Sequence, residues 1–168
     1  MKKTKQVAVI AVFIAMYFVL SALLKIPVGG HITLDLGYIA LTVSAVFLGG
    51  VPASVTGAAG AFLESALMSQ RGVSPGWVLM NAIVGFLCGT VLKKAAGEGG
   101  KKLIVSACIV VPLSMLLGVT VKTLVDCLLY DLPLLAKIPS GAAALIADSA
   151  VMLLFGLPLS MALKKRIK

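Results

Sequence analysis

Apolar segments alternate with short breaks containing glycine or proline along nearly the whole chain. A helix needs about 20 mostly apolar residues to cross a bilayer. The pattern predicts an all-α membrane domain over residues 1–168, with six spans at residues 7–24, 34–48, 51–69, 75–92, 103–129 and 139–163. The short second span is expected to cross with little tilt or to be partly re-entrant. The long fifth is expected to tilt or to be interrupted near Pro112.

Composition supports a membrane protein. The 168 residues are 60% hydrophobic and only 12% charged, with a mean hydropathy of +1.11, whereas soluble domains are about one quarter charged. The net charge of +9 is compatible in principle with nucleic-acid binding. However, the basic residues flank apolar segments, which is the pattern of cytoplasmic membrane anchors.

The distribution of lysine and arginine predicts the orientation. With six spans, eleven basic residues fall on the face that holds both chain ends: Lys2, Lys3, Lys5, Lys93, Lys94, Lys101, Lys102, Lys164, Lys165, Arg166 and Lys168. Only Lys25, Arg71 and Lys137 fall on the other face, and Lys122 lies within a span. The positive-inside rule therefore places both termini in the cytoplasm, as an even number of spans also requires.

Signatures of enzymes and metal sites are missing from the sequence. The cysteines at positions 88, 108 and 127 are isolated, so neither a metal site nor a disulfide framework is indicated. The run at residues 97–102 lacks the glycine spacing and the Ser/Thr of a P-loop, so the chain does not hydrolyse ATP by that route. We therefore expect no metal, no cofactor and no enzymatic activity.

Five ionisable side chains lie inside the apolar segments, and the predicted orientation places all of them at or above the midplane on the outer side. They are Asp35, Glu64, Lys122, Asp126 and Asp148. A charge in the hydrocarbon region costs roughly 3 kcal/mol or more, so such residues usually line a functional cavity. The inner halves of the spans contain no ionisable residue, which predicts a pocket open to the outside.

Each polar residue also has a structural interpretation. Lys122 and Asp126 are four residues apart and can pair with each other. Asp35 can cap the second span, and Trp77 can be an interfacial anchor above Asn81. His31 can be a solvated loop residue. Glu64 and Asp148 have no charged neighbour within a helical turn, which favours contact with a ligand or ion.

Small residues form stripes on the first and third spans. Ala8, Ala11 and Ala15 lie on one face of the first span, and Ala11 and Ala15 form an AxxxA unit. Small residues four apart let another helix approach closely. The rest of the first span is bulky and carries no charge for a pocket. Gly57, Gly60 and Ala61 repeat the pattern on the third span; both stripes are also compatible with ordinary packing within the chain.

Nearly the whole chain resembles the substrate-binding S component of energy-coupling factor (ECF) transporters, the vitamin-uptake branch of the ABC transporters. The resemblance rests on the size, the six spans, both ends inside, the AxxxA unit and one long stretch. That stretch, Ile26 to Gly57, reads IPVGGHITLDLGYIALTVSAVFLGGVPASVTG and is similar to the family's first outer loop with the span that follows it.

The resemblance implies high-affinity capture of one micronutrient near the outer surface, in the plasma membrane of a prokaryote. Residues 27–33 would be a lid. A transmembrane coupling subunit and two ABC ATPases would drive uptake, with Ala8, Ala11 and Ala15 at the interface with the coupling subunit. The expected substrate-binding residues are His31, Asp35, Tyr38, Glu64, Trp77, Asn81, Lys122, Asp126 and Asp148.

The sequence leaves the ligand open. The excess of carboxylates favours a cationic or amine-bearing heterocycle, and a thiamine precursor, a pyridoxine-type compound and a flavin all fit. Two other functions compete with vitamin capture. A stand-alone ion-coupled secondary transporter would need access from the inside, and a structural membrane protein would use the buried charges only to pair with one another.

Overall fold

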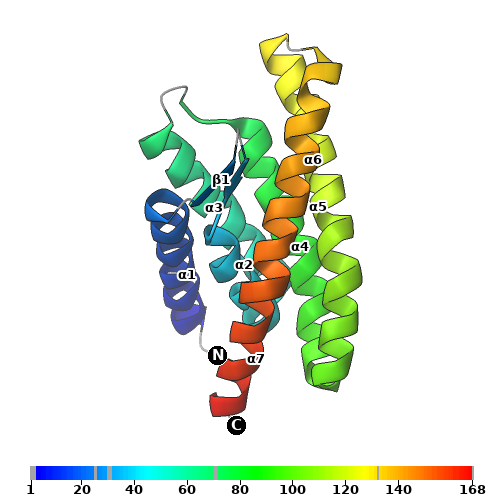
Figure 1. Cartoon of the computed structure of the whole chain (residues 1–168). Helices are drawn as coiled ribbons and strands as arrows, with labels where there is room; N and C mark the ends of the chain where they lie inside the picture. Colours follow the sequence, from blue (N-terminus) through cyan, green and yellow to red (C-terminus); the bar gives the residue numbers. More distant parts are fainter. Residues whose placement is uncertain (1–2, 25, 30–31, 70–71, 132, 168) are drawn as a thin grey trace.

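The computed structural model describes residues 3–24, 26–29, 32–69, 72–131 and 133–167, which fold into a helical bundle (Figure 1). Its elements in chain order are α1 (Lys3–Leu23), β1 (Ile26–Gly29), β2 (Ile32–Leu34), α2 (Gly37–Leu48), α3 (Gly50–Met68), α4 (Pro75–Glu98), α5 (Gly100–Tyr130), α6 (Leu134–Val151), the π-helical turn η1 (Met152–Gly156) and α7 (Leu157–Ile167). The six predicted spans all fold as helices of this bundle, the sixth as α6, η1 and α7 together. The predicted fold class is therefore confirmed.

Among the described residues, four helical stretches are long and apolar enough to cross a membrane: Thr4–Leu23, Pro75–Glu98, Gly100–Tyr130 and Lys137–Arg166. With 12 residues, α2 is too short for this criterion, which agrees with the short second span expected from the sequence. Although α2 is short, its residues from Tyr38 to Val46 are mostly buried, because other helices surround it.

Two predicted boundaries were wrong, and one of the two alternatives for the fifth span is excluded. Residues 93–102, expected to be a charged connector, are almost entirely helical, and Gly99 alone separates α4 from α5. Pro112 lies inside a continuous α5 and does not interrupt it. Lys137, expected in a loop, lies in the first turn of α6. Glycines with positive φ make the tight joints, Gly49 with φ 93° between α2 and α3 and Gly99 with φ 131°.

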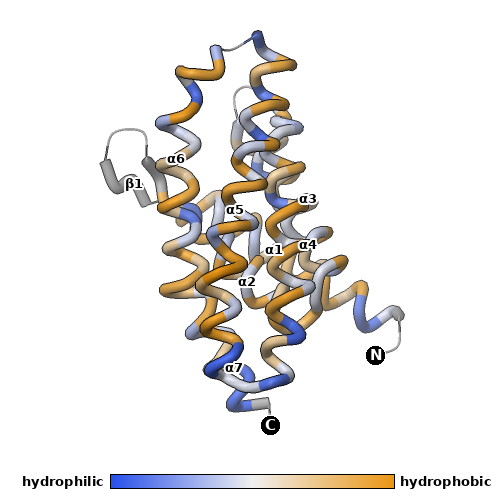
Figure 2. The backbone as a smooth tube through the Cα atoms, turned by 90° about the vertical axis from the view of Figure 1, so that its right-hand side faces the viewer, coloured by the Kyte–Doolittle hydropathy of each residue, from blue (hydrophilic) through white to orange (hydrophobic). Residues whose placement is uncertain are grey.

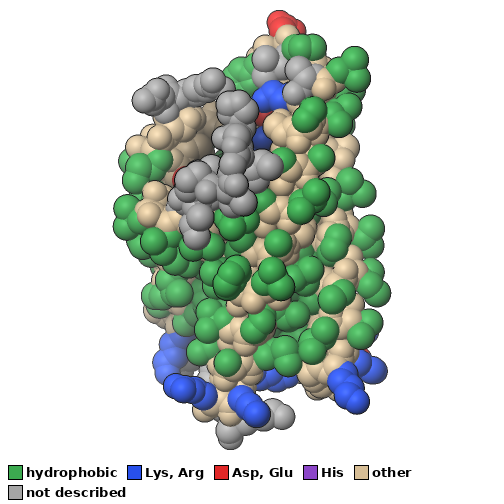
Figure 3. Space-filling model, viewed as in Figure 1, with side chains coloured by type: hydrophobic (Ala, Val, Ile, Leu, Met, Phe, Trp, Pro, Cys, Tyr) green, Lys and Arg blue, Asp and Glu red, His purple; other side chains and the backbone are tan. Residues whose placement is uncertain are grey.

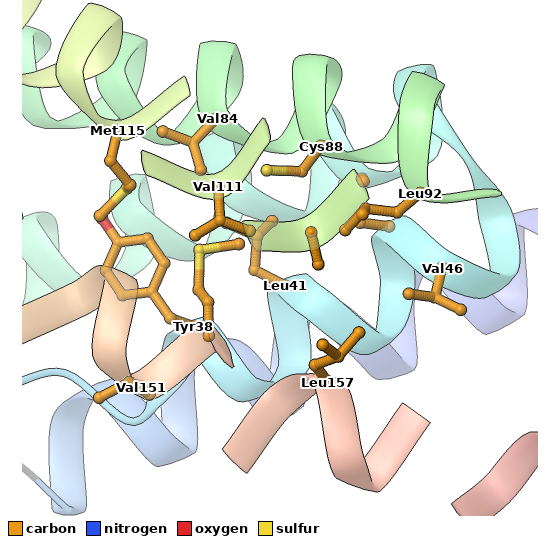
Figure 4. Close-up of a cluster of buried hydrophobic side chains, with 14 of the residues drawn as sticks. Tyr38, Leu41, Val46, Val84, Cys88, Leu92, Val111, Met115, Val151 and Leu157 are labelled. Atoms are coloured by element: carbon orange, nitrogen blue, oxygen red, sulfur yellow. The ribbon is translucent and has the colours of Figure 1, made fainter. Parts of the chain in front are cut away.

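The core forms around α2, which packs against α1, α3, α4 and the last span. Tyr38, Leu41, Met115 and Leu157 are among its fully or almost fully buried side chains (Figure 4). Glycine brings α3 and α4 into backbone contact, since a β-carbon at Gly85 would lie 2.4 Å from the Ala53 carbonyl oxygen. Close approach at small residues is a usual way for membrane helices to associate.

The outer surface of the bundle is apolar along most of its length and basic at one end. Hydrophobic side chains cover the middle of the visible face (Figure 3), and the backbone coloured by hydropathy is apolar over most of the helices (Figure 2). Lysine and arginine side chains gather at the end where α1 begins and α7 finishes, which also contains the joint between α4 and α5 (Figures 1 and 3). We call this the terminal end, and the opposite end, near β1 and β2, the hairpin end.

The connection between α1 and α2 contains a short antiparallel hairpin that the sequence did not predict. Ile26 pairs with Leu34 and Pro27 with Thr33, and an irregularity separates Pro27 from Gly29. The second strand contacts α6, so the connection lies against the last span. His31 lies outside the described residues, and the structure does not test its predicted role.

Candidate ligand-binding site

Buried polar and aromatic side chains from α1, α2, α3, α4, α5 and α6 converge toward the hairpin end of the bundle. The carboxylates that the sequence singled out are all buried: Asp35 is 3% exposed, Glu64 6%, Asp126 5% and Asp148 3%. Charged groups buried in a membrane protein are costly and usually mark a functional site. The convergence therefore defines the candidate ligand-binding site.

Trp77 and Glu64 form the centre of the site. The indole Nε1 of Trp77 donates a hydrogen bond of 3.0 Å to Glu64 Oε2, and the Lys122 ammonium lies 5.8 Å from the centroid of the same indole, within cation–π range. These three residues line an open cavity of about 430 Å³, together with Ser65, Met68, Ser69 and Ser74. The cavity thus presents an anionic, a cationic and an aromatic group to one ligand.

Trp77 also begins a chain of aromatic rings that leads into the core. The Tyr38 ring meets Trp77 edge-on at 6.4 Å between centroids, and the Tyr17 ring meets Tyr38 at 6.3 Å in the same manner. Asn81 holds this chain from one side, because it accepts a 2.9 Å hydrogen bond from the Tyr17 hydroxyl and donates one to the Trp77 carbonyl. The three rings therefore form one continuous contact from the cavity to α1.

Contacts with α1 and with the α2 backbone help to hold Asp35 at the entrance to α2. Its carboxylate accepts hydrogen bonds of 2.8 Å from the Ser21 hydroxyl of α1 and from the Gly37 backbone N–H. Asp35 does accept a hydrogen bond from the first N–H of α2, as a helix cap would. The expectation that such a cap would be exposed is wrong, because the side chain is buried. Asp35 therefore ties the end of the hairpin connection to α1.

Asp126 lies between two lysines. Its Oδ2 atom is 3.6 Å from Lys122 Nζ, the predicted i,i+4 pair, and 3.7 Å from Lys137 Nζ of α6. A β-carbon at Gly76 would lie 2.7 Å from Asp126 Oδ1, so the carboxylate also abuts the first turn of α4. This cluster links α4, α5 and α6 beside the cavity, and Lys122 belongs to both.

Asp148 reaches the site from α6. It is buried and lies near the Tyr38 and Tyr17 side chains, as Asp35 and Glu64 do. The Tyr38 hydroxyl is also buried, and the Asn81 side chain lies beside it.

Sequence reasoning missed three contributors to the site, Tyr17, Ser21 and Lys137. The first span was expected to supply no pocket group because it carries no charge, yet Tyr17 and Ser21 are fully buried on its inner face. The sequence did contain a sign of their role, because Tyr17 and Ser21 are polar side chains one helical turn apart in an otherwise apolar segment. Ala8, Ala11 and Ala15 lie on the opposite, exposed face of α1.

Metal binding is not supported by the described side chains. No group of three or more His, Cys, Asp or Glu residues among them is arranged to hold a metal ion. The positions predicted to bind a ligand lie around lysine, tyrosine and tryptophan instead, which suits an organic ligand.

Comparison with solved structures identifies the class of this bundle. The S component for biotin from an ECF-type ABC transporter superimposes with a TM-score of 0.70, over 98% of this chain and 93% of that one, at 18% identity. FolT bound with folic acid superimposes with a TM-score of 0.61, over 91% and 92%, at 17% identity. The chain therefore has the fold of an S component.

The sequence itself specifies the family. Residues 1–165 match the family described as ECF-type riboflavin transporter, S component, and the chain belongs to that family. It is thus a multi-pass membrane transport protein, and the resemblance seen in the sequence is confirmed. No curated protein sequence matches the chain significantly.

Proposed function

We propose that this protein captures an aromatic heterocyclic vitamin from the outer side of a prokaryotic plasma membrane and delivers it for ATP-driven uptake. The observation that carries the proposal is the cavity between Glu64, Trp77 and Lys122 at the hairpin end. Its volume of about 430 Å³ falls within the usual range for small-molecule sites, about 300–1,000 Å³. The positive-inside rule places the hairpin end outside, opposite the basic terminal end.

Riboflavin is the first ligand to test. The family's description supports it, and so does the chemistry of the cavity. A flavin ring offers a flat surface for the Trp77 indole and a polar edge with both donors and acceptors, which Glu64 and Lys122 complement. The neighbouring Asp35 and Asp148 also favour a cationic heterocycle, which makes an aminopyrimidine or pyridoxine-type vitamin the second candidate.

The partners follow from the family. We propose that a transmembrane coupling subunit packs against the exposed alanine face of α1 and that two ABC ATPases supply the energy. On that face Ala11 and Ala15 are exposed one turn apart, so another helix can approach the backbone closely. A stand-alone secondary transporter would take up its substrate without added subunits.

The test is to purify the protein gently, denature it and identify the released small molecule by mass spectrometry. A stoichiometric flavin supports the proposal and names the ligand. A stoichiometric cationic heterocycle supports capture but replaces riboflavin. An empty protein that also fails to quench riboflavin fluorescence and binds no member of a vitamin panel contradicts the capture function.

A further inference from the structure

A second cavity lies at the terminal end, far from the candidate vitamin site. It has a volume of about 570 Å³ and is lined by the two glycines at the α4–α5 joint, by Leu103, Met161 and Ala162, and by Lys164 and Lys165 of α7. The cavity therefore combines an apolar wall with two ammonium groups at the level where the bundle leaves the apolar zone (Figure 2).

No acidic side chain of the described residues lines this cavity. Of the six acidic residues of the sequence, Glu98 alone belongs to this end, and its carboxylate is bound to Lys102 at 2.9 Å, outside the lining of the cavity. Lys164 donates to the Ala96 carbonyl at the end of α4, which fixes its position on the cavity wall. Lys165 is exposed.

The glycine joint leaves backbone uncovered beside these lysines. A β-carbon at Gly99 would meet nothing within 4 Å, and one at Gly100 would meet only the Met161 methyl group at 3.5 Å. Gly100 begins α5, and no described side chain caps that helix start. The N–H groups of the first turn are thus available to an anion, in addition to the two lysines.

We propose that this cavity binds the headgroup of an anionic phospholipid, with an acyl chain lying along the wall formed by Leu103 and Met161. At the same level α5 also presents apolar side chains to the lipid, since Ile104 is 42% exposed and Val105 60% exposed. An amphiphile with a phosphate matches both halves of the cavity, and basic pockets between helices on the cytoplasmic side of a membrane bind acidic lipid headgroups. A soluble anion would use only the basic half.

The experiment places the full chain in nanodiscs with equal amounts of phosphatidylglycerol and phosphatidylcholine and measures retained lipid by native mass spectrometry after transfer to detergent. We expect selective retention of phosphatidylglycerol. The double variant Lys164→Gln/Lys165→Gln should lower that retention roughly tenfold or more. The matched control Lys5→Gln/Lys94→Gln removes two exposed charges outside the cavity lining and should change it little.

Because Lys164 also holds Ala96, a second variant tests the cavity without removing charge. Gly100→Leu extends a side chain toward Met161 into the cavity, and it should reduce phosphatidylglycerol retention while both lysines stay. Equal retention of both lipids by the unmodified protein, or full retention by Gly100→Leu and by the double lysine variant, would overturn the proposal.

Two further results would assign the cavity to a different ligand and so also overturn the proposal. Complete displacement of the lipid by inorganic phosphate would make it a simple anion site, because the apolar wall would contribute nothing. If the double variant Lys164→Gln/Lys165→Gln retained the lipid normally but no longer bound a coupling subunit, the two lysines would belong to a protein interface. Neither result depends on which vitamin occupies the hairpin end.

Discussion

The Tyr17 hydroxyl donates a hydrogen bond of 2.9 Å to Asn81 Oδ1, joining α1 to α4 at a fully buried point. Sixty-four positions separate the two residues in sequence. Asn81 in turn donates to the carbonyl of Trp77, so the position of the tryptophan in the candidate site depends on a contact made by the first helix.

Replacing Tyr17 with phenylalanine should destabilise the protein while keeping the ring. The change leaves the Asn81 carbonyl oxygen buried without its donor, which costs about 1–3 kcal/mol. Thermal unfolding in detergent should therefore shift to lower temperature. Tyr130→Phe removes a hydroxyl from a half-exposed ring and serves as the control. Equal midpoints for the two variants would show that the Tyr17 bond does not contribute.

Gly60 should tolerate no side chain, because α1 packs directly on it. A β-carbon there would lie 2.4 Å from the Tyr17 ring, so Gly60→Ala should push α1 away at a cost of about 1–3 kcal/mol, typical of overpacking. Gly97→Ala is the matched control, since a β-carbon at Gly97 meets nothing within 4 Å and alanine favours the helix. The midpoint temperature of unfolding should fall for Gly60→Ala and should stay the same or rise for Gly97→Ala.

Glu64→Gln should weaken ligand binding without unfolding the bundle. The amide keeps an acceptor for the Trp77 indole but removes the negative charge, and the loss of a charged hydrogen bond corresponds to roughly tenfold or more in affinity. Trp77 is the only tryptophan of the chain, so its fluorescence reports the site directly. Riboflavin is the probe, and Glu98→Gln at the terminal end is the control that should bind it as the unmodified protein does. If Glu64→Gln also bound riboflavin with unchanged affinity, Glu64 would not belong to the site.

Ala15→Trp should block assembly with a coupling subunit but leave ligand binding intact. Ala15 is exposed on α1, and a bulky ring there prevents close approach of another helix. Co-purification of added ECF subunits measures the loss. Ile109→Trp places the same ring on an exposed, lipid-facing part of α5 and should assemble normally. Normal assembly of Ala15→Trp would exclude this face as the interface.

The sequence was sufficient for the helices because hydropathy and glycine breaks act locally. It predicted the break between the second and third spans at residues 49–50, the buried positions of Glu64 and Asp148, and, as one interpretation, the pairing of Lys122 with Asp126. Each of these depends on residues within a helical turn or on the cost of charge in an apolar segment.

Contacts between distant helices could not be predicted in the same way. Lys137 pairs with Asp126 only because α6 starts earlier than the apolar pattern indicated, and Tyr17 reaches Asn81 only through the packing of α1 on Gly60. Residues 93–102 look like a loop by charge and glycine content. Apart from Gly99 they are helical, because lysine and alanine favour helices and Ala95 and Ala96 pack into the core.

The π-helical turn η1 changes the phase of the last span. In it the Leu157 N–H bonds to the Met152 carbonyl, five residues back, so one more residue fits into the turn. An α-helix rotates about 100° per residue, and the inserted residue turns everything beyond it by about that angle. Asp148 before the turn, Met152 and Gly156 at its two ends, and Ser160 after it are consequently all buried. A helical wheel drawn through the whole span with a single period would place one of these groups on the wrong face, so residues 134–151 and 157–167 need separate wheels.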